Sequence, residues 1–272
     1  MSLDYDIKVE GSRNLLIIVD ETPFFHPEMI EDLLHRLKNY MRVSILVMRR
    51  APRKGNINLN LLHRIHEIGM ISIIKLLLSF LHKKLFKSEC WYCGKRKFMP
   101  SVRFVADRNA CDYSEVWNLE ELSRYFERIE NNYFDILISS NSWYLKEEWL
   151  NKVRIASLNR HSSLLPSYGG LWPIVHNALA GEEFFGVSVH KMTSKVDRGP
   201  VLSQQKILSL SGETIYSRYS KAFKCSGELI RDAIEKCYHD ELPNQPNYQS
   251  SYFGKLKRGD LSRLKALGVS FI

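Results

Sequence analysis

Asn14-Leu15-Leu16-Ile17-Ile18-Val19 is an apolar run, and it ends at the polar sequence Asp20-Glu21-Thr22-Pro23. This pattern is expected of a buried parallel strand that leads into a loop. Pro27 then opens a helical pattern whose apolar residues fall on one face, and a second apolar run from Val43 to Met48 predicts the next strand. A strand, a helix and a strand in this order predict a right-handed parallel crossover. We therefore expect an α/β fold with a Rossmann-like, mostly parallel sheet flanked by helices.

The composition is that of a globular protein with anionic partners. The chain has 272 residues, 44% of them hydrophobic, which suffices for one substantial core or one core with a small appendage. A net charge of +9 favours phosphates, nucleic acid or an acidic membrane surface, without choosing among them. Five cysteines without regular spacing favour reduced thiols, and the acidic first residues lack the apolar core of a secretory signal. We expect a cytoplasmic location.

The segment 56–87 is apolar with helical spacing, but Lys75 and His82 interrupt it. No run of about 18 apolar residues remains, so we expect no transmembrane helix. The segment can pack against the sheet or against a second copy in a homodimer, or rest on a membrane as an amphipathic helix. Cys90 and Cys93 have the spacing of half a zinc site. Because the second half is missing, we expect a loop with two free thiols and no metal.

Three chemically complementary side chains stand in two motifs. Arg154 to Leu158 reads as a strand that delivers Asn159-Arg160-His161-Ser162-Ser163-Leu164-Leu165-Pro166, and Val196-Asp197-Arg198-Gly199-Pro200 follows later. An amide, an imidazole and a carboxylate suffice for acyl transfer to an amine. The amide donates to the developing oxyanion, the imidazole moves a proton, and the carboxylate orients the imidazole. The alternative is a turn asparagine, a core histidine and a turn aspartate.

These motifs resemble the signature of the folate-dependent formyltransferases, Asn-x-His-x-Ser-Leu-Leu-Pro followed by Asp-x-Gly. The resemblance is strong from Phe134 to Ile207. It implies a catalytic domain over residues 1–207, followed by a short C-terminal helical extension with a basic tail over 208–272. The helical insertion at about 56–100 departs from the family, whose members usually have a shorter connection there. The resemblance also implies 10-formyltetrahydrofolate as co-substrate, no metal, and Asn159, His161 and Asp197 as the catalytic residues.

The apolar strand Phe134 to Ile138 leads into a loop at the carboxyl edge of the sheet, where ligands collect. In the family this loop holds the pterin ring. The resemblance therefore predicts folate contacts at Ser140, Asn141, Trp143, Tyr144, Leu145, Val196 and Gly199, and acceptor contacts at Ser163, Tyr168 and Gly170. Trp143 and Tyr144 serve equally well as aromatics at the edge of the core. His176 and His190 are interpreted as structural.

The amine acceptor is a separate question. Pro173 at a helix start resembles the tRNA and sugar branches of the family, and residues 20–24 lack the Gly-rich phosphate loop of the glycinamide ribonucleotide branch. After Ile207 only a helix from about Glu213 to Tyr238 and a polar tail are expected, which is too little for the β-barrel of methionyl-tRNA formyltransferases. We therefore expect a nucleotide-linked amino sugar, whose pyrophosphate suits the positive charge. A methionyl-tRNA formyltransferase-like enzyme, with its basic tail on tRNA, and a non-catalytic formyltransferase-like binding domain are the alternatives.

Overall fold

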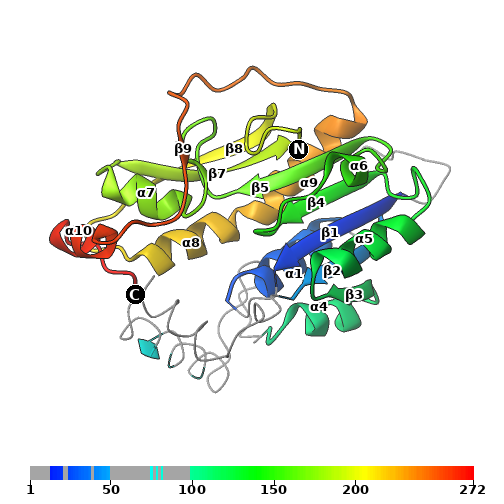
Figure 1. Ribbon diagram of the computed structural model, residues 1–272, viewed down its shortest axis with the longest axis horizontal. Helices are drawn as coiled ribbons and strands as arrows, with labels where there is room; N and C mark the ends of the chain where they lie inside the picture. Colours follow the sequence, from blue (N-terminus) through cyan, green and yellow to red (C-terminus); the bar gives the residue numbers. More distant parts are fainter. Residues whose placement is uncertain are drawn as a thin grey trace, which may run out of the picture.

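The computed structural model describes residues 13–20, 24–37, 40–49, 74–75, 78, 81 and 99–272. These residues form a seven-stranded sheet in the order β3-β2-β1-β4-β5-β7-β8, with helices packed along it (Figure 1). The sheet strands are β1 (Asn14–Asp20), β2 (Arg42–Met48), β3 (Asp112–Val116), β4 (Ile136–Ser140), β5 (Ala156–His161), β7 (Phe184–Lys191) and β8 (Val201–Leu208). A separate two-stranded sheet joins β6 (Gly169–Gly170) to β9 (Tyr252–Phe253).

The helices cover both faces of the large sheet. They are α1 (His26–Leu37), α4 (Val102–Arg108), α5 (Leu119–Arg128), α6 (Glu147–Leu150), α7 (Pro173–Leu179), α8 (Ile215–Lys224), α9 (Ser226–Tyr238) and α10 (Asp260–Ala266). Alternate residues of β1 show the two layers, because neighbours on a strand point to opposite faces. Leu15 and Ile17 pack in one cluster with α1, α4 and α9, whereas Leu16 and Ile18 pack in another with α5 and α6. The α/β sheet with helices on both faces is confirmed.

The strand pairing shows at which edge of the sheet a ligand is expected to bind. From β3 to β5 all neighbours are parallel, whereas β7 pairs antiparallel with both β5 and β8. The strand order reverses between β1 and β4, and in such sheets ligands bind in the crevice outside the carboxyl ends of the strands. Asp20 ends β1 and Ser140 ends β4 at this edge.

The C-terminal part differs from the sequence expectation. The single helix expected over 213–238 is two helices, α8 and α9, which meet at Cys225. The break lets α9 lie along α1 while α8 packs on α7. Phe223 and Ile230 share the core cluster of Leu15, so these helices complete the main core, and the division at residue 207 stays a prediction. The tail expected to be merely polar contains β9 and α10.

Several sequence predictions fall on residues that the structure does not describe. Most of the insertion at 56–100 is among them, as are Cys90 and Cys93. Among the described residues, no helix combines the length and apolar character needed to cross a membrane. The cysteines of this part of the chain, Cys111, Cys225 and Cys237, are free thiols.

Candidate active site

Asn159 and His161 lie inside the last strand of the parallel half of the sheet, not after it. β5 continues to His161 because its end pairs with the antiparallel strand β7, opposing Asn159 to His190 and His161 to Ser188. Two residues apart on a strand, the Asn159 and His161 side chains project from the same face. A paired strand fixes their backbone more firmly than a loop would.

Asp197 brings the two motifs together. It lies between β7 and β8 with a φ of 54°, and its side chain is buried. Its Oδ1 is 3.3 Å from Asn159 Nδ2 and 3.7 Å from His161 Nδ1, and its Oδ2 accepts from the Gly170 N–H at 2.8 Å. The structure therefore brings the three predicted catalytic side chains to one point beside the carboxyl edge of the sheet.

The hydrogen bonds of His161 define its tautomer. Its Nε2 is 3.1 Å from the Tyr168 carbonyl, which can only accept, so Nε2 carries the hydrogen. Burial lowers the pKa of His161, although Asp197 acts in the opposite direction, so the imidazole is neutral near pH 7. Nδ1 then presents a lone pair toward Asp197. At 3.7 Å no hydrogen bond joins them, so Tyr168, rather than Asp197, sets the tautomer.

Asp197 is ionised at this point. Burial opposes its charge most strongly, but His161 in its protonated form and the Gly170 N–H hold the pKa of Asp197 well below the ordinary value of an aspartate. A carboxylate therefore stands beside a neutral imidazole, which is the arrangement that stabilises a proton arriving on that imidazole.

His190 belongs to the site, although the sequence reasoning interpreted it as structural. It is 2% exposed, and its Nδ1–H donates to the Lys191 carbonyl at 2.9 Å. The remaining nitrogen, Nε2, lies 3.3 Å from Asn159 Nδ2 and 3.5 Å from Asp197 Oδ1. The sequence signal that could have found it is a strand that ends at a histidine and leads directly into the loop of Asp197.

Arg160 projects from the opposite face of β5, where its contacts hold the strand in place. Its Nε donates to Ser226 Oγ at 2.9 Å and its Nη1 to Ser162 Oγ at 2.6 Å, while its guanidinium lies 3.8 Å from the centre of the Phe223 ring. Burial lowers the pKa of this side chain to about 10. The side chain ties β5 to the junction of α8 and α9.

The residues predicted to contact the acceptor lie on or beside the loop that follows β5. Ser163 is 4% exposed, and its hydroxyl donates to the Ser167 carbonyl. The Tyr168 hydroxyl donates to Glu182, and its ring stacks on Phe253. Gly170 contributes its backbone N–H to Asp197. Their contact with an acceptor stays a prediction, and for Ser163 and Tyr168 the side-chain hydroxyls already have partners.

The predicted folate loop follows β4. Ser140 Oγ lies 3.2 Å from His26 Nε2, and Asn141 Oδ1 accepts from the Trp143 N–H, which closes a tight turn. Leu145 is 3% exposed in the core with Phe126, whose ring stacks on Trp149, and Trp143 packs at the edge of that cluster.

Three further residues predicted to touch folate differ in exposure. Tyr144 is 58% exposed and Val196 is 45% exposed, so both side chains are open to a ligand. Only glycine fits at position 199, because a Cβ there would collide with the Lys191 carbonyl. A cavity of about 700 Å³ lies elsewhere, along β2, β3 and α5, and none of the predicted site residues lines it.

Part of the chain is similar to known formyltransferases. Residues 127–234, which include β5, β7 and the Asp197 loop, match the family described as formyl transferase. Over these residues the chain is similar to that family. A methionyl-tRNA formyltransferase from Mycoplasmopsis pulmonis is 34% identical over 129 residues, which are 47% of this chain and 45% of the relative. The chain thus spans about half the length of the curated relatives it matches.

Solved formyltransferases have the same fold. Glycinamide ribonucleotide transformylase 1 from Symbiobacterium toebii superposes with a TM-score of 0.58 over 90% of this chain and 96% of its own, at 16% identity. WlaRD, a sugar 3N-formyl transferase determined with dTDP and 5-N-formyl-THF, gives a TM-score of 0.54 over 90% of this chain and 70% of its own, also at 16% identity. At these identities the likeness concerns the fold.

Proposed function

We propose that this protein is a formyltransferase, which transfers a formyl group from 10-formyltetrahydrofolate to a primary amine, using Asn159, His161 and Asp197. The observation that supports it is the convergence of an amide, a neutral imidazole and a carboxylate on one another at the end of β5. This donor set suits a carbonyl whose oxygen gains negative charge and an amine that loses a proton.

His161 and Asp197 have complementary parts in this reaction. The new bond joins the amine nitrogen to the formyl carbon, the bond to the folate nitrogen breaks, and one proton passes from the first nitrogen to the second. Nδ1 of His161 is the nitrogen with a free lone pair, because Nε2 donates to Tyr168. A proton held at Nδ1 lies 3.7 Å from the Asp197 carboxylate, which stabilises the imidazolium.

Asn159 supplies the donor to the developing oxyanion. Its Nδ2 is shared between Asp197 Oδ1 and His190 Nε2, each at 3.3 Å. Both distances lie beyond the usual 2.7–3.2 Å range, so these are weak hydrogen bonds that can be exchanged for a stronger one to an anionic oxygen. His190 keeps the amide oriented from the neighbouring strand.

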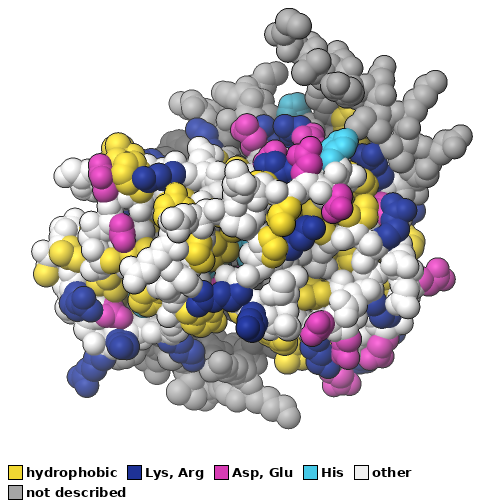
Figure 2. All heavy atoms as spheres, turned by 90° about the horizontal axis from the view of Figure 1, so that it is seen from above, with side chains coloured by type: hydrophobic (Ala, Val, Ile, Leu, Met, Phe, Trp, Pro, Cys, Tyr) yellow, Lys and Arg dark blue, Asp and Glu magenta, His cyan; other side chains and the backbone are white. Residues whose placement is uncertain are grey.

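For the acceptor we favour a nucleotide-linked amino sugar. Solved relatives in this fold include sugar N-formyltransferases, one of them determined with dTDP, and the net charge of +9 suits a pyrophosphate. Figure 2 shows one face, on which Lys and Arg side chains are spread among acidic and apolar ones. A methionyl-tRNA acceptor is the second candidate, because the curated relatives with the higher sequence identity are methionyl-tRNA formyltransferases.

The test is turnover with both acceptor classes. Purified protein is given 10-formyltetrahydrofolate with a panel of amino sugar nucleotides, or with charged initiator methionyl-tRNA. Release of tetrahydrofolate is followed by absorbance, and formylation of the acceptor by mass spectrometry. Turnover with a sugar nucleotide and none with tRNA supports the proposal, and the reverse selects the second candidate. Folate binding without turnover of either class would identify a binding domain. Asn159→Ala serves as the control for the site.

A further inference from the structure

The C-terminal part of the chain crosses back over the loop that follows β5. We call residues 249–253 the latch. Its strand, β9 (Figure 1), pairs in parallel with β6. The N–H groups of Gly169 and Leu171 donate to the carbonyls of Ser251 and Phe253 at 3.0 and 2.9 Å. The Ser251 N–H donates to the Pro166 carbonyl at 3.1 Å. The pairing thus joins residues about eighty positions apart.

Side chains strengthen this contact. Ser251 Oγ accepts from the Tyr168 N–H at 2.8 Å, and the Gln249 carbonyl accepts from Ser167 Oγ at 2.7 Å. The Phe253 ring stacks on Tyr168 and on His176, with centroid separations of 5.4 and 4.5 Å. Phe253 therefore occupies a slot between the loop and α7.

The backbone of the loop is shaped to receive the latch. Tyr168 has a φ of 56° and Gly170 one of 91°. A bulky residue in the left-handed region is uncommon and is kept there only by its surroundings. A Cβ at Gly170 would collide with the Phe253 carbonyl, so the two chains lie in direct backbone contact.

The same short loop holds the active site on its other side. The Tyr168 carbonyl accepts from His161 Nε2, while the Tyr168 N–H is bonded to the latch. The Gly170 N–H donates to Asp197 Oδ2, while the N–H groups on either side of it are bonded to the latch. The latch and the catalytic groups thus hold opposite edges of one stretch of backbone.

We propose that the latch is a positioning element of the active site. It sets the tautomer of His161 through Tyr168 and the place of the Asp197 carboxylate through Gly170. Ser251 and Phe253 are then positioning residues for the formyl transfer proposed above, on which this inference rests. The latch itself, within the segment expected from the sequence to be a basic tail, then holds the backbone that carries the catalytic contacts.

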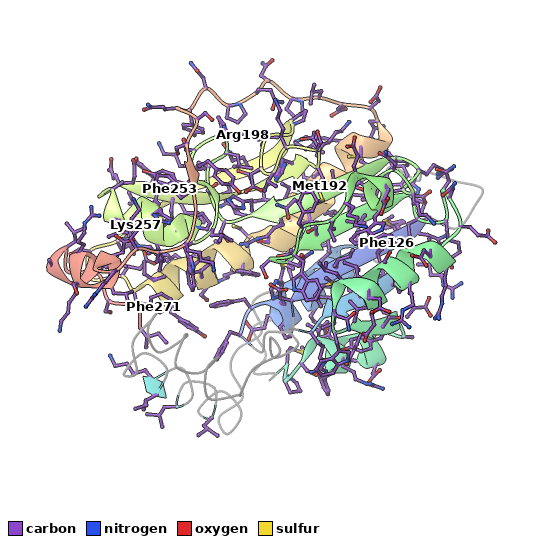
Figure 3. All side chains as sticks on the ribbon, viewed as in Figure 1. Phe126, Met192, Arg198, Phe253, Lys257 and Phe271 are labelled. Atoms are coloured by element: carbon purple, nitrogen blue, oxygen red, sulfur yellow. The ribbon has the colours of Figure 1, made fainter. Side chains whose placement is uncertain are left out.

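The test compares two aromatic residues of the same C-terminal segment. Phe253→Ala removes the ring that stacks on Tyr168, whereas Phe271→Ala removes a ring that packs on Trp172, the residue before α7, and not on Tyr168 or Gly170. Figure 3 labels both residues, and they lie apart. We expect Phe253→Ala to lower kcat by ~10²-fold, as a displacement of about 1 Å does. Folate affinity in calorimetry should stay unchanged, and Phe271→Ala should keep wild-type kcat. Phe253→Tyr, which retains the ring, should restore turnover.

A second measurement does not depend on turnover. Nitrogen-15 NMR of the imidazole, assigned by its loss in His161→Asn, reports which nitrogen of His161 carries the hydrogen. We expect hydrogen on Nε2 in the wild type and a mixture of tautomers in Phe253→Ala and in Ser251→Ala. The NMR measurement separates the two proposals. If the wild type shows no turnover but the variants show the expected change of tautomer, formyl transfer is refuted and the latch is retained. The latch is refuted by unaltered His161 shifts in both variants, or by equal losses of kcat in Phe253→Ala and Phe271→Ala. If Phe253→Ala does not fold, the tautomer of His161 in Ser251→Ala decides whether the latch is retained.

Discussion

Asp197→Asn removes one negative charge from the site and almost no volume. In the wild type the carboxylate lies 3.7 Å from His161 Nδ1, with both side chains almost fully buried. At an effective dielectric of about 20, a pair of unit charges at this distance interacts by about 4 kcal/mol. The interaction exists only when His161 is protonated, so it stabilises the transition state and not the resting site. Its loss corresponds to a fall in kcat of ~10³-fold.

Steady-state kinetics with saturating 10-formyltetrahydrofolate and the identified acceptor measures the effect. Calorimetric folate affinity should change little, because the resting imidazole is neutral. Asp32→Asn is the matched control, since this buried carboxylate pairs with Arg36 on α1. A fall in kcat of less than about tenfold in Asp197→Asn, or an equal fall in the control, would refute stabilisation of the His161 imidazolium by the Asp197 carboxylate.

Three more outcomes follow from the geometry. Asn159→Ala should lower kcat by ~10²-fold to ~10³-fold with normal melting, because it removes an oxyanion donor; wild-type kcat would assign that role elsewhere. Tyr144→Ala should weaken folate binding in calorimetry, since the ring is open to a ligand, whereas Leu145→Ala should cost about 2–5 kcal/mol in denaturant unfolding; the reverse pattern would contradict both placements. Burial, with Arg160, lowers the pKa of His26 to about 3. The unfolded chain therefore binds the extra proton between about pH 6.5 and pH 3, and stability falls as the pH drops through that window, by about 2 kcal/mol from pH 7 to pH 5. His26→Gln should reduce the pH slope in urea titrations, with the buried His161 contributing the rest. An unchanged slope would contradict the role of His26.

The sequence predicted β1, α1 and β2 because each depends on local signals, an apolar run or a helical stripe bounded by Asp20 or Pro27. The three catalytic candidates came from motifs, and the structure brings them together. What was missed depends on pairing between distant residues. β5 reaches His161 only because β7 lies beside it, and that register also places His190 against Asn159.

The latch and the C-terminal helices were missed for the same reason. β6 and β9 have two residues each, too few to show any periodicity, and they exist because they pair with each other. The break at Cys225 interrupts a continuous helical pattern, and it is decided by the different surfaces against which α8 and α9 pack. Local patterns carry no information on either.

β5 lies at the seam of the sheet, parallel to β4 on one side and antiparallel to β7 on the other. Asn159, His161 and His190 therefore belong to strands inside the sheet, and we expect these strands to open only near global unfolding. Asp197 stands instead on a connecting loop, in a backbone conformation that few side chains adopt. Its local opening needs less free energy than global unfolding. On warming, the site should lose its carboxylate while its amide and imidazoles are still in place, so that heat inactivation precedes melting and reverses on cooling.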